Sequence, residues 1–146
     1  MALEFRNFVT FDADFPEDSQ WGKGGIALVP GGKGIAQSLR DRLQDQGFSC
    51  TQVGQHSFYG WAFDARNRGV NARCLLQFPG PWLLTCDRRT SFLARLVGKD
   101  RDTSMRQFLA TIEGILHADK RFSNIRWHSK SDYEHGKENR ASRSPC

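Results

Sequence analysis

The sequence predicts an α+β fold, in which two main helices pack on one face of an antiparallel sheet of about five or six strands. Two observations lead to this prediction. Residues 59–78 show the alternating pattern of a β-hairpin, and residues 33–46 and 105–116 each show the spacing of an amphipathic helix. The elements follow in the order strand, helix, several hairpin-linked strands, helix and strand. Helices on one face of an antiparallel sheet are the expected packing for that order.

The hairpin is the clearest pattern in the chain. Tyr59, Trp61 and Phe63 fall on one face of the first strand, because side chains alternate between the two faces of a strand. The segment 67–69 predicts a tight turn. On the returning strand the apolar positions also alternate; they are Val70, Ala72, Cys74, Leu76 and Phe78.

The strand predicted first in the chain runs from Leu3 to Phe11, with Val9 and Phe11 on one face. Phe8 breaks the alternation, so we expect it to face a second layer. The apolar segment 26–29 is compatible with a strand or a buried connector, since its length does not decide between them. Further strands are expected at 50–53, 82–87 and 124–128.

Both helices are marked by apolar stripes. Ile35, Leu39 and Leu43 recur at helical spacing, and Gly47 provides a stop after the first helix. Residues 100–104 supply N-cap candidates for the second helix, and Ser104 with Gln107 fits a capping box. Its stripe consists of Met105, Phe108, Leu109, Ile112, Ile115 and Leu116. Gly114 within this helix suggests close packing on the sheet, and residues 91–97 suggest a short helical turn.

We expect a single domain over residues 1–128 and a disordered tail over 129–146, because the tail is polar and nearly free of apolar residues. No run of about 18 apolar residues and no signal peptide is present, so a cytoplasmic location is the default expectation. Cys74 and Cys86 lie on predicted strands and are expected to be small core residues rather than disulfide partners.

Charge is distributed unevenly. The first 20 residues hold five acidic residues and one basic residue, a net of −4, although the whole chain has a formal charge of +5. The remainder is therefore strongly basic, which favours either an anionic partner or simple solubility.

A glycine-rich segment opens the first helix and suggests a phosphate loop. The pattern fails, because Lys33 is followed by Gly34 rather than by Ser or Thr. A helix N-terminus can still bind an anion through its backbone N–H groups. Gly32, Lys33 and Gly34 are therefore the candidate anion-binding residues.

The acidic loop of residues 12–18 lacks the spacing of a calcium loop. The cysteines and histidines lack the spacing of a zinc site, and no nucleophile elbow is present. We therefore expect no metal, no cofactor and no enzymatic activity. An arginine cluster near residues 88–106, beside strand aromatics, leaves nucleic-acid binding open as an alternative.

Three segments carry a resemblance: 30–32 (Pro-Gly-Gly), 59–63 (Tyr-Gly-Trp-Ala-Phe) and 121–127 (Arg-Phe-Ser-Asn-Ile-Arg-Trp). Their layout resembles small stand-alone bacterial proteins of mostly uncharacterised type, some of which are immunity proteins that neutralise a cognate toxin. The resemblance implies a non-enzymatic protein that blocks another protein by steric occlusion. Exposed Trp and Arg are common interface anchors, so the candidate partner-binding residues are Asp12, Asp14, Glu17, Asp18, Trp21, Arg88, Arg89 and Arg95.

Overall fold

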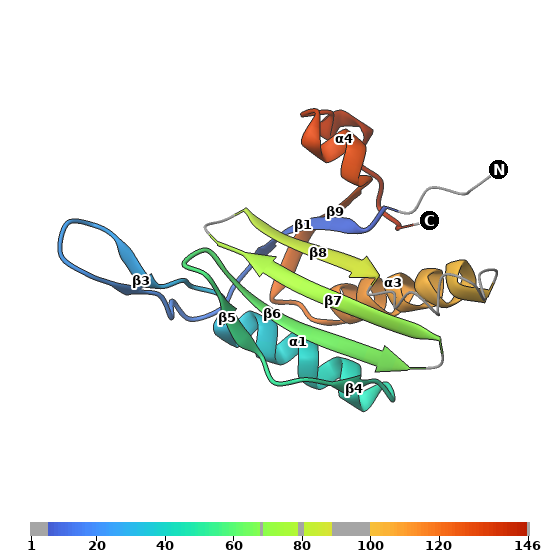
Figure 1. Cartoon of the computed structure of the whole chain (residues 1–146). Helices are drawn as coiled ribbons and strands as arrows, with labels where there is room; N and C mark the ends of the chain where they lie inside the picture. Colours follow the sequence, from blue (N-terminus) through green and yellow to red (C-terminus); the bar gives the residue numbers. More distant parts are fainter. Residues whose placement is uncertain (1–5, 68, 79–80, 89–99, 146) are drawn as a thin grey trace.

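The computed structural model describes residues 6–67, 69–78, 81–88 and 100–145. Within these residues it contains a seven-stranded antiparallel sheet, a separate two-stranded sheet and two long helices, so the predicted α+β fold is confirmed (Figure 1). The strand order of the main sheet is β4-β6-β7-β8-β1-β9, with β5 beside β6. Its strands are β1 (Phe8–Ala13), β4 (Ser49–Cys50), β5 (Gly54–His56), β6 (Gly60–Asn67), β7 (Val70–Gln77), β8 (Trp82–Arg88) and β9 (Phe122–His128). None of the described helices has the length and apolar character that crossing a membrane requires.

The predicted hairpin forms the centre of the sheet as β6 and β7. Trp61 lies opposite Leu76, and Phe63 lies opposite Cys74, so the apolar faces of the two strands coincide. All four side chains are buried in the main core cluster. The hydrophobic pattern therefore determined the register, because a slip by one residue would turn this face to solvent.

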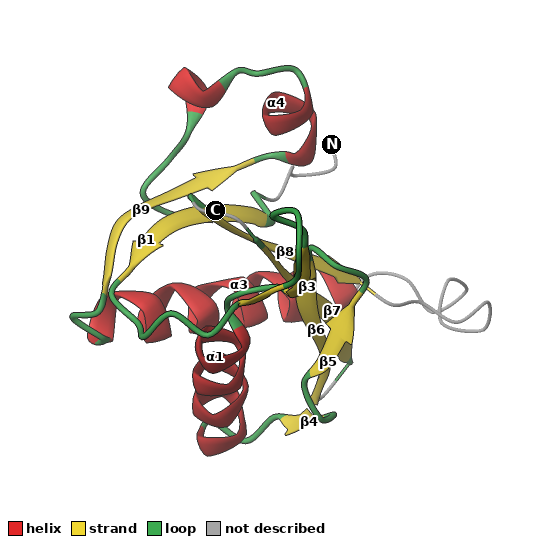
Figure 2. Ribbon diagram, turned by 90° about the vertical axis from the view of Figure 1, so that its left-hand side faces the viewer, coloured by secondary structure: helices red, strands yellow, loops and turns green. Residues whose placement is uncertain are grey.

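Helices α1 (Lys33–Asp45) and α3 (Asp100–Ala118) lie on the same side of the curved sheet, as Figure 2 shows. The stripe of α1 is confirmed, since Ile35, Leu39 and Leu43 are fully buried. The predicted capping box is wrong, because α3 begins at Asp100 and Ser104 lies inside the helix.

The expectation that Gly114 allows close packing is also wrong. Gly114 is exposed, and a Cβ atom built there would have no neighbour within 4 Å. The predicted helical turn at 91–97 lies outside the described residues.

Strand β1 lies between β8 and β9, and the Arg6 N–H before it donates to the Pro145 oxygen at 3.0 Å. Val9 and Phe11 enter the main core as predicted. Phe8 faces the opposite side, where its ring packs edge-on against Tyr133 at 5.6 Å. The expected second layer for Phe8 is thus confirmed, and the C-terminal segment provides it.

The C-terminal segment has a defined path up to residue 145, which differs from the expectation of disorder. It contains α4 (Lys130–Glu134), capped by Ser129, and the 3-10 turn η1 (Glu138–Arg140). Ser142 then pairs with Trp127 through reciprocal N–H···O bonds of 2.7 and 2.8 Å. The segment needs no core of its own, because it folds onto backbone and aromatic groups that β1 and β9 provide.

Candidate protein-binding site

A small hairpin projects from one end of the main sheet (Figure 1). It consists of β2 (Gln20–Trp21) and β3 (Ala27–Val29), and we call residues 20–29 the arm. Gly24 and Gly25 both have positive φ, at 82° and 76°, which the turn of the arm requires. Of the two alternatives for segment 26–29, the structure shows a strand at Ala27–Val29, in which Leu28 is exposed and Val29 is half-buried against the main core.

The arm holds three of the four large apolar side chains that are exposed among the described residues. Their exposed fractions are 57% for Trp21, 66% for Ile26 and 62% for Leu28. The fourth, Phe58, is 68% exposed and lies in the turn between β5 and β6. The Gln55 side chain joins the two regions, because its Nε2 donates to the backbone oxygen of Leu28 at 3.5 Å. We call these four exposed apolar residues together the apolar patch; on the arm they occupy both faces, because Trp21 pairs with Ala27 whereas the Leu28 side chain lies beside Gly22.

A row of three aromatic rings connects the arm to the β7–β8 end of the main sheet. The Trp21 ring lies 6.0 Å from that of Phe78, which in turn lies 6.0 Å from that of Trp82. The indole N–H of Trp21 donates to Ser19 Oγ at 2.9 Å, and the Ser19 hydroxyl donates to Glu17. These contacts hold the exposed indole in one orientation, which reduces the entropy that a partner would have to remove on binding.

Asp18 closes the base of the arm. Its Oδ1 accepts from the backbone N–H of Gly32 and its Oδ2 from that of Gly34, both at 2.8 Å. The carboxylate therefore caps the start of α1, where free N–H groups and the helix dipole favour a negative charge. Gly32 has φ 102°, and a Cβ built there would lie 2.8 Å from the Trp82 ring, so this close approach requires glycine.

Two of the backbone donors in the candidate anion site are thus already used by Asp18. The third candidate, Lys33, places its ammonium 5.5 Å from the centre of the Trp61 ring. The same indole donates to the backbone oxygen of Pro30 at 2.9 Å. The start of α1 is therefore tied to the β6 core and to the arm by contacts within the chain.

The remaining candidate residues lie in different places. Asp12 is exposed on β1, and Asp14 is exposed next to it, with its backbone N–H bonded to Arg121. Arg88 ends β8 at the opposite end from Trp82, about 20 Å away at the rise of a strand. Arg89 and Arg95 lie outside the described residues. The structure therefore brings Asp18, Glu17 and Trp21 together with the start of α1, but not with Arg88.

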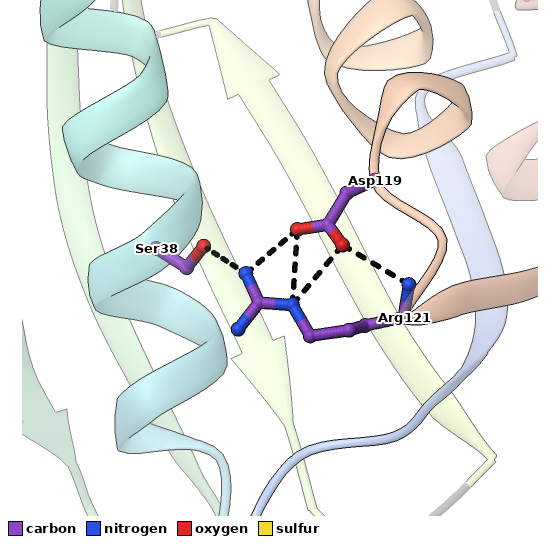
Figure 3. A network of polar contacts seen from close by, with 3 residues as sticks. All are labelled: Ser38, Asp119 and Arg121. Atoms are coloured by element: carbon purple, nitrogen blue, oxygen red, sulfur yellow. Dashed lines mark hydrogen bonds and ion pairs between the residues drawn. The ribbon is translucent and has the colours of Figure 1, made fainter.

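A polar network that the sequence did not suggest joins the end of α3 to α1 (Figure 3). The Arg121 guanidinium binds both oxygens of Asp119, at 2.7 Å for the shortest contact, and also Ser38 Oγ at 3.4 Å. The hydrogen bond from the Arg121 side chain lowers the pKa of Asp119 to about 2. The same guanidinium lies 4.1 Å above the ring of Phe15. The arrangement is a structural tie between α1, β9 and the loop after β1.

A cleft of about 470 Å³ lies between the end of α1, the β6–β7 turn and α3. Amide side chains from Gln46, Asn67 and Gln107 line it above Phe108. Among the residues that the structure describes, its lining contains no acidic or basic side chain. Within the described part of the chain, moreover, no group of three or more His, Cys, Asp or Glu residues is placed to hold a metal ion.

Comparison with known proteins gives no relative: no family model, no curated protein and no solved structure matches this chain.

Proposed function

We propose that this chain is a non-enzymatic protein-binding protein that docks a partner protein on the apolar patch. The observation that carries the proposal is the projecting arm with three apolar side chains more than half exposed. Large exposed apolar side chains that gather on one projecting segment are typical of interaction sites. Aromatic anchors such as Trp21 are enriched among residues that dominate binding free energy.

The charges around the arm favour a protein partner over nucleic acid. Glu17 lies at its base, and Lys23 lies in its exposed turn, so the surroundings carry both signs. A nucleic-acid site requires a dominant basic surface, because phosphate contacts supply most of the affinity. Of the candidates Arg88, Arg89 and Arg95, Arg88 lies within the described residues, at the far end of the sheet.

An immunity protein is the specific form of this proposal that the sequence resemblance suggests. In that form the arm would enter or cover a functional cleft of a toxin and exclude its substrate by steric occlusion. A projecting hairpin held by Asp18 and an aromatic row suits insertion, because little of it has to be ordered on binding.

The test is affinity purification of the tagged full chain from its native host, with and without nuclease, followed by binding of the purified partner. Trp21→Ala is expected to weaken that binding by about 30-fold or more, as an interface anchor does. Lys120→Ala, an exposed change in the α3–β9 turn, is the control and is expected to bind like the wild type.

Equal binding by the Trp21 variant, in a chain that still unfolds cooperatively, would contradict the use of the arm. Recovery of nucleic acid, with an affinity that falls steeply between about 50 and 200 mM salt, would support the alternative instead.

A further inference from the structure

Two buried thiols face each other across the centre of the sheet. Cys74 on β7 lies directly opposite Cys86 on β8, and both side chains are fully buried in the main core. Directly opposed side chains of an antiparallel pair have Cβ atoms about 4.5–5.5 Å apart, so the two thiols are neighbours on the core face of the sheet. Neither residue belongs to the apolar patch or to the contact of Asp18 with the start of α1, which we call the clamp.

The hydrogen bonds of Cys86 identify the type of strand pair. Its backbone N–H donates to the Asn7 oxygen at 3.0 Å, and its oxygen accepts from the Asn7 side chain at 2.9 Å. Both backbone groups therefore point toward the β1 side, away from β7. Cys74 and Cys86 thus form a non-hydrogen-bonded pair, in which opposing Cα atoms typically lie about 4.5 Å apart. A disulfide accepts Cα separations of about 4.4–6.8 Å, so the pair can be bridged without moving the strands apart.

We propose that Cys74 and Cys86 form a reversible dithiol–disulfide site that reacts with small two-electron oxidants of the peroxide class. One thiolate attacks the peroxide oxygen, which gives a sulfenic acid and releases one water from hydrogen peroxide. The other thiol attacks that sulfur, forms the Cys74–Cys86 bond and releases a second water. Two thiols are oxidised and one peroxide is reduced to two waters, and an external dithiol reverses the reaction by exchange.

The surroundings make this reaction selective and slow. The hydrogen bond with Cys86 and burial both raise the pKa of the Cys74 thiol, so little thiolate is present near neutral pH. Cys50 is half-buried on β4 and lies opposite Ala65, so no cysteine faces it there. Oxidation of the pair is therefore expected to accelerate as pH rises and to leave Cys50 out of the bridge.

The bridge would lie within the β7–β8 hairpin, whose far end carries Phe78 and Trp82. Cross-linking residues 74 and 86 restricts the unfolded chain without changing the pairing of the folded one. The oxidised protein is accordingly expected to melt about 10 °C above the reduced one. This inference does not depend on what the arm binds.

The test uses the full chain with Cys50→Ala and Cys146→Ala, so that Cys74 and Cys86 are the remaining cysteines. The folded protein is treated with hydrogen peroxide, and a second sample is refolded from urea in oxidised and reduced glutathione. Intact mass and peptide mapping are expected to show the loss of two hydrogen atoms and a linked 74–86 peptide pair in both samples. Dithiothreitol is expected to reverse both the link and the rise in melting temperature.

The matched control carries Cys86→Ala in the same background and is expected to show no internal link. Three results would overturn the proposal: no link after refolding in oxidised glutathione, a link that forms in the refolded sample and not in the folded one, or oxygen adducts without a bridge.

Discussion

Replacing Asp18 with alanine removes the clamp that joins the base of the arm to the start of α1. The substitution deletes two acceptors, which now bind the N–H groups of Gly32 and Gly34 at 2.8 Å. The substitution does not touch the aromatic row around Trp21. It therefore removes only the cap at the start of α1 and the negative charge of Asp18.

The expected loss follows from these two bonds. Hydrogen bonds to a charged group contribute about 1.5–3 kcal/mol each, and a helix cap contributes about 1 kcal/mol on average. Gly34 is only half-buried, so water replaces part of what its N–H loses. We therefore expect Asp18→Ala to reduce the free energy of unfolding by about 2–3 kcal/mol, and Asp18→Asn, which keeps one acceptor oxygen, by about 1 kcal/mol. The larger loss corresponds to a fall in melting temperature of about 6–12 °C.

Urea unfolding followed by tryptophan fluorescence and circular dichroism measures these differences. Asp14→Ala is the matched control, because it removes the same charge from an exposed neighbouring position. It is expected to change stability by no more than about 0.5 kcal/mol. If Asp18→Ala proves as mild as Asp14→Ala, the carboxylate does not clamp the arm, and the reasoning fails.

Three further predictions concern the rest of the fold. Gly114→Ala is expected to raise the free energy of unfolding by about 0.5–1 kcal/mol, because the site is helical, exposed and open; a loss in urea titrations would contradict this. Asp119→Asn is expected to cost about 1 kcal/mol at pH 6, since its partly exposed ion pair is screened. That difference from wild type should vanish as pH falls toward 2, because the depressed pKa gives stability that is present above about pH 4 and lost through the folded value of about 2. Removing residues 129–146 should leave a cooperative thermal transition but lower the stability by about 2–3 kcal/mol, since Phe8 loses its contact with Tyr133; an unchanged melting temperature would show that the segment does not pack.

The parts of the fold that the sequence predicted share one property: each is encoded by its own periodicity. The alternation around Trp61 and the stripe through Leu39 required no knowledge of distant residues. The capping box was wrong, because Ser104 and Gln107 have the composition of a cap but lie inside a helix that already includes Asp100. The path of residues 129–145 was missed for a related reason. A segment with few apolar residues can still be ordered when it covers apolar residues elsewhere, as Tyr133 covers Phe8.

The candidate site shows most directly what cannot be predicted from short segments of the sequence taken one at a time. Taken separately, the acidic loop suggests a site that binds cations, and the glycine-rich helix start suggests a site that binds anions. In the folded chain they are partners of each other, because Asp18 supplies the anion that the N–H groups of Gly32 and Gly34 require. This pairing uses the Asp18 carboxylate and two helix-start donors within the chain, although Asp12 and Asp14 stay exposed. Residues 20–29 connect the two paired segments, and three of their apolar side chains remain exposed. The proposed docking surface is thus the segment between two groups that satisfy each other inside the molecule.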